Sequence, residues 1–100
     1  MLYVELKKEY CLSKNGTEYV KNHFIFGCSC CNLKVDIVDF NVTVLQNERI
    51  ESVLIEKVDD RLVCTTIDYQ IPWNYKSAIN RLLQHCIKCD LQQNEEIKSI

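Results

Sequence analysis

Residues 2–70 alternate between apolar and polar positions in short segments, which is the pattern of half-buried β-strands. Residues 2–11 are rich in strand-forming side chains, and residues 17–26 form a second segment of the same kind. Between them, Asn15 and Gly16 favour a tight turn, because this pair tolerates positive φ at both central positions. The chain is therefore predicted to begin with an antiparallel hairpin.

A third extended segment covers residues 34–46, but its apolar positions change face. Val35 and Ile37 share one parity, whereas Val38 and Phe40 share the other. A side-chain period of two cannot change face without a defect. We therefore expect a bulge, a bend or a strand break near Ile37 and Val38.

Two further strands, residues 50–58 and 61–70, are predicted on either side of a tight turn at Asp59 and Asp60. One helix follows, with Asn74 available to cap its start and an expected end near Asp90. Its apolar positions recur with helical spacing and form one stripe, made of Tyr75, Ala78, Ile79, Leu82, Leu83, Cys86 and Ile87.

The connections between the predicted strands are short, so neighbouring strands should run antiparallel. The helix needs an apolar surface to cover, and the sheet supplies one. We thus expect an α+β domain in which an antiparallel five-stranded meander sheet has one C-terminal helix packed on a face. Residues 1–91 are predicted to form this single domain, and the polar residues 92–100 a flexible C-terminal tail.

Composition and charge argue against some classes of function and location. The 100 residues carry a formal net charge of −2, without the basic surplus of a nucleic-acid-binding protein. We therefore expect no direct contact with nucleic acid. Residues 1–9 lack the apolar core of a signal peptide, and the apolar runs are too short to span a bilayer. A cytoplasmic location without membrane contact is expected, and there clustered cysteines favour metal or free thiols over disulfides.

The seven cysteines are the main candidates for a functional site. Three stand within one predicted turn and two close the predicted helix, so a zinc site could form where the turn meets the helix. The candidate ligands are Cys28, Cys30, Cys31, Cys86 and Cys89. The alternative is that these residues stay as buried or free thiols, or pair as disulfides. The possible cofactor is thus either none or one structural zinc ion.

The sequence contains few features that would indicate a catalytic site. The Cys86–Cys89 pair closes a helix, whereas the redox-active form of this motif opens one and gains from the helix dipole. Phosphate-binding loops and the zinc-protease motif are missing from the sequence. His23 and His85 are the only histidines. Although His85 directly precedes Cys86, the sequence around either histidine forms no recognisable nucleophile motif. We therefore expect a protein that is not an enzyme.

The favoured function is a small non-catalytic protein-binding module. The composition is biased toward Ile, Lys and Asn, a bias that is common in short viral and phage proteins. The module could therefore be a viral or phage accessory or inhibitor protein that acts on a host protein. An unpaired sheet edge could bind that partner or support a homodimer. The first alternative is a zinc-stabilised adaptor in a nucleic-acid or transcription complex, and the second is a small thiol-dependent enzyme.

Overall fold

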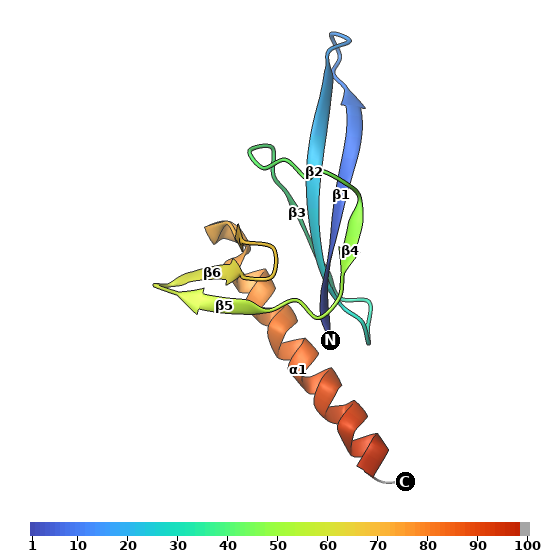
Figure 1. Cartoon of the computed structure of the whole chain (residues 1–100), viewed down its shortest axis with the longest axis vertical. Helices are drawn as coiled ribbons and strands as arrows, with labels where there is room; N and C mark the ends of the chain where they lie inside the picture. Colours follow the sequence, from blue (N-terminus) through green and yellow to red (C-terminus); the bar gives the residue numbers. More distant parts are fainter. Residues whose placement is uncertain (99–100) are drawn as a thin grey trace.

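A computed structural model describes the backbone of residues 1–98 and the side chains of residues 1–92. The fold is α+β, with two antiparallel sheets and one C-terminal helix (Figure 1). In chain order the elements are β1 (Leu2–Leu12), β2 (Glu18–Cys28), β3 (Lys34–Val38), β4 (Glu48–Ile50), β5 (Ile55–Val58), β6 (Arg61–Cys64), β7 (Tyr69–Gln70), the 3₁₀ helix η1 (Trp73–Tyr75) and α1 (Lys76–Lys98).

The predicted hairpin is confirmed and is the longest feature of sheet A. β1 and β2 pair along their full length, from Leu2 opposite Cys28 to Leu12 opposite Glu18. The turn differs in detail from the expectation, because Gly16 has a positive φ of 78° and Asn15 does not. Ser13 accepts the backbone N–H of Gly16 at 3.0 Å and donates its own to Thr17. The loop is therefore longer than a two-residue turn.

Sheet A has four strands in the order β3-β2-β1-β4, so the predicted five-stranded meander is wrong. The expected break occurs where predicted, since β3 ends at Val38. After it the chain does not continue beside β3. It crosses to the other edge of the sheet, where β4 pairs with β1.

The remaining strands form a separate sheet B, ordered β5-β6-β7. Ser52 has a positive φ of 56° and divides the expected strand 50–58 into β4 and β5. The tight turn at Asp59 and Asp60 is confirmed, with φ values of 47° and 65°. Asp68, with a φ of 51°, divides the expected strand 61–70 in the same way.

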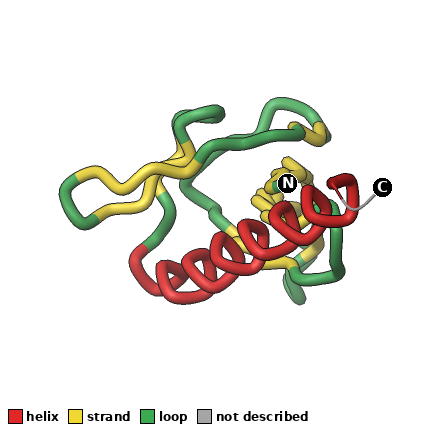
Figure 2. The backbone as a smooth tube through the Cα atoms, turned by 90° about the horizontal axis from the view of Figure 1, so that it is seen from below, coloured by secondary structure: helices red, strands yellow, loops and turns green. Residues whose placement is uncertain are grey.

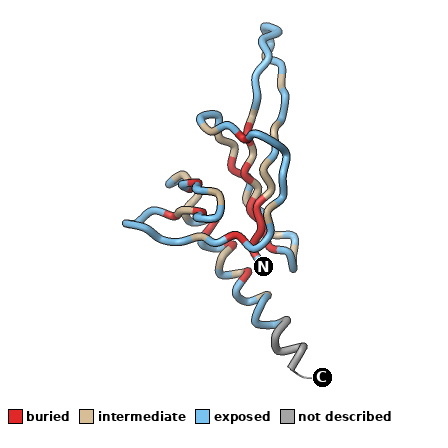
Figure 3. The backbone as a smooth tube through the Cα atoms, viewed as in Figure 1, coloured by how far each residue is buried: buried red, intermediate tan, exposed pale blue. Residues whose placement is uncertain are grey.

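The helix packs against β2 and β3 through the predicted apolar stripe, in which Ile79, Leu82 and Cys86 are buried. Seen along the long axis, α1 crosses beside the strands of sheet A, while the β5–β6 hairpin projects away (Figure 2). The core lies where these elements meet (Figure 3). α1 runs to Lys98, so the expected helix end near Asp90 is wrong. The division into a domain and a flexible tail, 92–100, stays a prediction.

The end of the β1–β2 hairpin extends beyond this core. We call residues 9–21 the distal arm. It projects at one end of a molecule that measures 60 × 32 × 20 Å, and the far part of α1 projects at the other end (Figure 1). Among residues 1–98, no helix combines the length and apolar character that a bilayer crossing requires.

Candidate metal centre

The first two sulfur atoms of the site come from the end of β2. Cys28 is the last residue of this strand, stands opposite Leu2 and is only 1% exposed. A tight turn follows, in which the backbone N–H of Cys31 donates to the carbonyl of Cys28 at 3.4 Å. The backbone N–H of Cys28 donates in turn to the carbonyl of Leu33, also at 3.4 Å. This turn keeps Cys31 beside Cys28, with Cys31 half-buried.

The other two sulfur atoms come from α1. Cys86 and Cys89 are three residues apart, which places them on neighbouring positions of one helix face. Cys86 is 5% exposed and continues the apolar stripe that Ile79 and Leu82 begin. Because this stripe packs on sheet A, it carries both thiols toward the end of β2.

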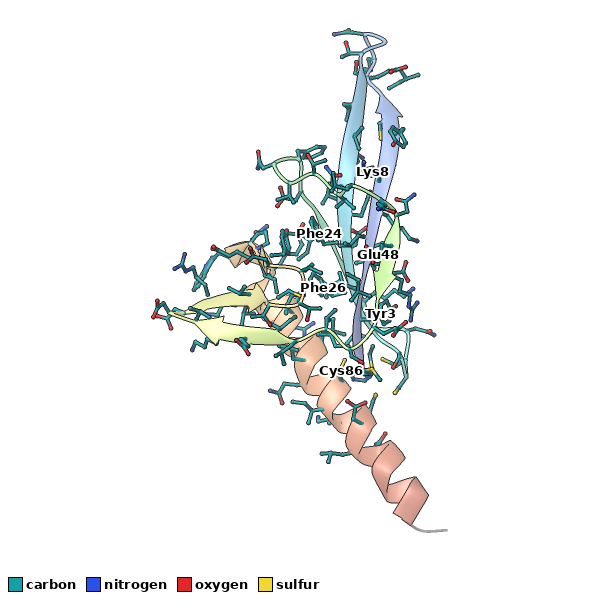
Figure 4. All side chains as sticks on the ribbon, viewed as in Figure 1. Tyr3, Lys8, Phe24, Phe26, Glu48 and Cys86 are labelled. Atoms are coloured by element: carbon teal, nitrogen blue, oxygen red, sulfur yellow. The ribbon has the colours of Figure 1, made fainter. Side chains whose placement is uncertain are left out.

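The two pairs meet. The Sγ atoms of Cys28, Cys31 and Cys89 lie within 4.8 Å of one another. Cys86 lies close enough to Cys28 for each thiol to shift the pKa of the other, but its sulfur is not one of these three. Figure 4 shows sulfur atoms gathered beside Cys86, near α1 and at the end of the hairpin away from the distal arm. Ligand sulfurs around tetrahedral zinc are about 3.8 Å apart, given a Zn–S distance of about 2.3 Å. The three sulfurs are thus near the required spacing.

The electrostatics of the group make Cys28 easier to ionise than the thiols around it. Burial alone would raise the pKa of Cys28, but hydrogen bonds from the backbone of Cys30 and from the surrounding thiols outweigh it and lower the pKa. Burial, reinforced by the neighbouring Cys28, raises the pKa of Cys86 and of Cys89. Cys28 therefore ionises most readily, and a bound cation would favour deprotonation of Cys86 and Cys89 as well.

Of the five predicted ligands, the structure brings three together, Cys28, Cys31 and Cys89, and a fourth, Cys86, lies near Cys28 outside that group. Cys30 is exposed, and its Sγ atom is 3.9 Å from the hydroxyl of Ser29, outside the group of three. Spacing could have shown this, since Cys28 and Cys31 repeat the C-x-x-C spacing of Cys86 and Cys89. Cys64 is fully buried in the core. All seven cysteines are free thiols.

A second polar cluster was not expected from the sequence. The imidazole of His23 lies between two carboxylates, with Nε2 2.7 Å from Oε2 of Glu9 and Nδ1 3.0 Å from Oδ1 of Asp36. The Cys11 thiol donates to the other oxygen of Glu9 at 3.5 Å. Each ring nitrogen already has a carboxylate partner, so this cluster ties β1, β2 and β3 together and is no metal site.

Comparison with protein-family models, with curated proteins and with solved structures gives no significant match. The function is therefore inferred from the geometry of the chain itself.

Proposed function

We propose that this protein is a small non-catalytic binding module whose fold is locked by one structural zinc ion, held by the thiolates of Cys28, Cys31, Cys86 and Cys89. The observation that supports this most strongly is the convergence of sulfur atoms from two distant chain segments. Thiolate sets of this kind suit zinc, and four protein ligands close its coordination sphere. The ion would join the end of sheet A to α1.

Burial favours a structural role over a catalytic one. A thiol nucleophile must be reached by its substrate, but Cys28 and Cys86 are 1% and 5% exposed. A catalytic zinc keeps one coordination position open, whereas four cysteines fill all of them. The thiol-enzyme alternative is correspondingly weaker. The adaptor alternative shares the zinc site and differs only in its partner.

Protein binding is supported by the surface outside the core. The distal arm exposes Tyr10 and Leu12, whose exposed fractions are 78% and 68%. Exposed apolar side chains that lie together on a projecting element are typical of interaction surfaces. The net charge of −2 favours a protein partner over nucleic acid. A viral or phage origin, a host-protein target and a cytoplasmic location all stay predictions.

Metal analysis tests the zinc site directly. Protein purified without chelators should contain one zinc ion per chain by inductively coupled plasma mass spectrometry. The Cys31→Ser and Cys89→Ser variants should lose most of it. Cys30→Ser is the matched control, because it changes an exposed cysteine of the same turn and should retain the metal. Zinc-free wild-type protein from zinc-supplemented cultures, or equal loss in Cys30→Ser and Cys31→Ser, would contradict the site.

Partner capture tests the binding role. The zinc-loaded chain and a Tyr10→Lys, Leu12→Lys variant serve as paired baits. A protein retained by the first bait and lost with the second supports a binding module that uses the arm. Recovery of nucleic acid alone, sensitive to nuclease, would instead favour the adaptor alternative.

A further inference from the structure

The distal arm continues the buried face of sheet A into solvent. Even-numbered residues of β1 share one face with even-numbered residues of β2, because opposite residues of an antiparallel pair point the same way. Near the core this face is buried, as at Val4 and Phe26. In the arm the same face carries Tyr10, opposite Val20, and then Leu12. These three side chains are exposed.

The loop between β3 and β4 covers this sheet face only as far as Asn22 on β2 and Lys8 on β1. The backbone N–H of Val44 donates to the buried side chain of Asn22 at 3.2 Å, which anchors the crossing loop on β2. On the other strand, Asn47 accepts the backbone N–H of Lys8 at 2.8 Å. Past these two contacts, the side chains of this face are exposed among residues 1–92, as at Tyr10, Leu12 and Val20.

The β1 edge of the arm also offers unpaired backbone groups. Lys8 directs its N–H toward the β4 side, and Leu2 directs its carbonyl there, accepting from Val53 at 3.0 Å. The backbone N–H and C=O groups of even-numbered β1 residues therefore point to this edge, because those of alternate residues point to opposite neighbouring strands. β4 pairs only with Val4 to Leu6. Within the described chain, the N–H and C=O groups of Tyr10 and Leu12 thus have no strand beside them.

We propose that this edge binds the same edge of a second copy of the chain, antiparallel about a two-fold axis. With Cys11 opposite Cys11 of the second copy, Tyr10 of each chain stands opposite Leu12 of the other. Each such pair exchanges two backbone hydrogen bonds, so the ladder contains four. The apolar face then continues across the seam, and Glu9 stands opposite the hydroxyl of Ser13.

The β2 edge is a poorer surface for self-association. The carbonyl of Asn22 accepts from Asp39 at 2.9 Å, so even-numbered residues of β2 face that edge. The unpaired residues there are Glu18 and Val20. The equivalent two-fold pairing places the carboxylate of Glu18 beside Val20 of the second copy. On the β1 edge the same symmetry pairs two apolar side chains instead, which stabilises the contact.

The size of this contact sets the expected affinity. Stable interfaces bury about 800 Å² on each partner, and a four-residue ladder with three apolar side chains offers less. We therefore expect a concentration-dependent dimer with a Kd on the order of 10 µM. Edge strands of soluble proteins are normally protected by charge or by a covering loop. No loop pairs with Tyr10 and Leu12, but this register brings Lys8 of one copy near Lys14 of the other, and that like-charge contact agrees with a weak dimer.

Sedimentation velocity over a range of concentrations tests the dimer, with proline variants to identify the edge. Tyr10→Pro removes an N–H that faces away from β2, so the hairpin keeps its own hydrogen bonds and the ladder between copies is lost. We expect at least a tenfold rise in the dimer Kd. Val20→Pro is the matched control on the opposite edge and should leave the Kd unchanged. Circular dichroism confirms that both variants fold.

A crosslink tests the register. Opposite residues at a non-hydrogen-bonded position have Cβ atoms about 5 Å apart, so a short bismaleimide should join Cys11 to Cys11. The experiment uses a Cys30→Ser background, and peptide mass spectrometry identifies the crosslinked site. A monomer at every concentration, or a dimer that survives Tyr10→Pro and fails with Val20→Pro, would overturn the proposal. A dimer without the Cys11 crosslink would overturn this register.

Discussion

The ring of Phe24 stacks on the ring of Tyr69, with centroids 3.9 Å apart and an interplanar angle of 3°. Phe24 belongs to sheet A and Tyr69 to sheet B, so this pair joins the two sheets. The hydroxyl of Tyr69 also donates to Oδ2 of Asp39 at 3.2 Å, in the loop that leaves β3. Burial, with the nearby Asp39 carboxylate, raises the pKa of Tyr69, so the hydroxyl stays a donor at neutral pH.

Substitution of Tyr69 should separate the ring contact from the hydrogen bond. Tyr69→Phe keeps the stack and removes the bond to Asp39, which should lower the free energy of unfolding by about 1 kcal/mol. Tyr69→Ala also leaves a cavity beside Phe24 and should cost about 3–4 kcal/mol. Urea unfolding measures both. Tyr19→Ala, at an exposed position, is the control, and a similar cost there would contradict the role of Tyr69.

Local patterns predicted much of this fold. The break after Val38 follows from a change of parity, and the turn at Asp59 and Asp60 from residues that tolerate positive φ. The division at Ser52 could not be predicted, because serine has no marked preference for positive φ. The pairing of β4 with β1 is a long-range contact, and a strand of three residues carries too short a pattern to identify its neighbour.

The ligands of the candidate site could likewise be predicted only in part from local sequence patterns. Helical spacing correctly placed Cys86 on the buried stripe. The choice between Cys30 and Cys31 depended on the turn after Cys28, whose geometry arises from backbone hydrogen bonds to Cys28 and Leu33. Those bonds involve no side chain, so the C-x-x-C spacing of Cys28 and Cys31 was the one sign of this choice that the sequence offered.

The His23 cluster should make stability depend on pH. A hydrogen bond to Asp36 is the main cause that raises the pKa of His23, Glu9 adds to it, and partial burial opposes both. The folded state therefore favours the imidazolium. Its stabilisation is complete below the unfolded pKa, near 6.5, and is lost as the pH rises through the higher folded pKa. Urea midpoints should thus fall across this range.

Variants of the cluster assign that pH dependence. His23→Gln removes the titrating group and should flatten the fall in urea midpoint above pH 6.5, while Asp36→Asn should reduce it. The midpoint of the His23 imidazole proton shift, measured by NMR, should move down in Asp36→Asn. A wild-type slope that persists in His23→Gln would show that another group controls stability in this range.

Gly27 should be sensitive to any added side chain. It stands opposite Tyr3, and a Cβ atom at this position would collide with the Tyr3 ring. That ring is 3% exposed and is covered by the guanidinium of Arg49, 3.8 Å from its centroid, so it cannot move freely. Gly27→Ala should therefore cost about 1–3 kcal/mol in urea unfolding. Tyr3→Leu in the same chain should restore part of the loss, and no recovery would contradict the steric explanation.

Zinc removal should loosen the junction between sheet A and α1 more than the rest of the fold. The proposed ligands join residues 28–31 to residues 86–89, whereas the β1–β2 ladder and the Phe24–Tyr69 stack do not depend on them. Free zinc at about a thousand times its Kd should stabilise the folded state by about 4 kcal/mol. Hydrogen exchange followed by mass spectrometry should show faster exchange in both ligand segments after chelation, with less change in β1. Cys30→Ser should respond to chelator as wild type does. Uniform acceleration along the chain would instead indicate that the metal supports the whole core, and no change anywhere would remove the zinc site.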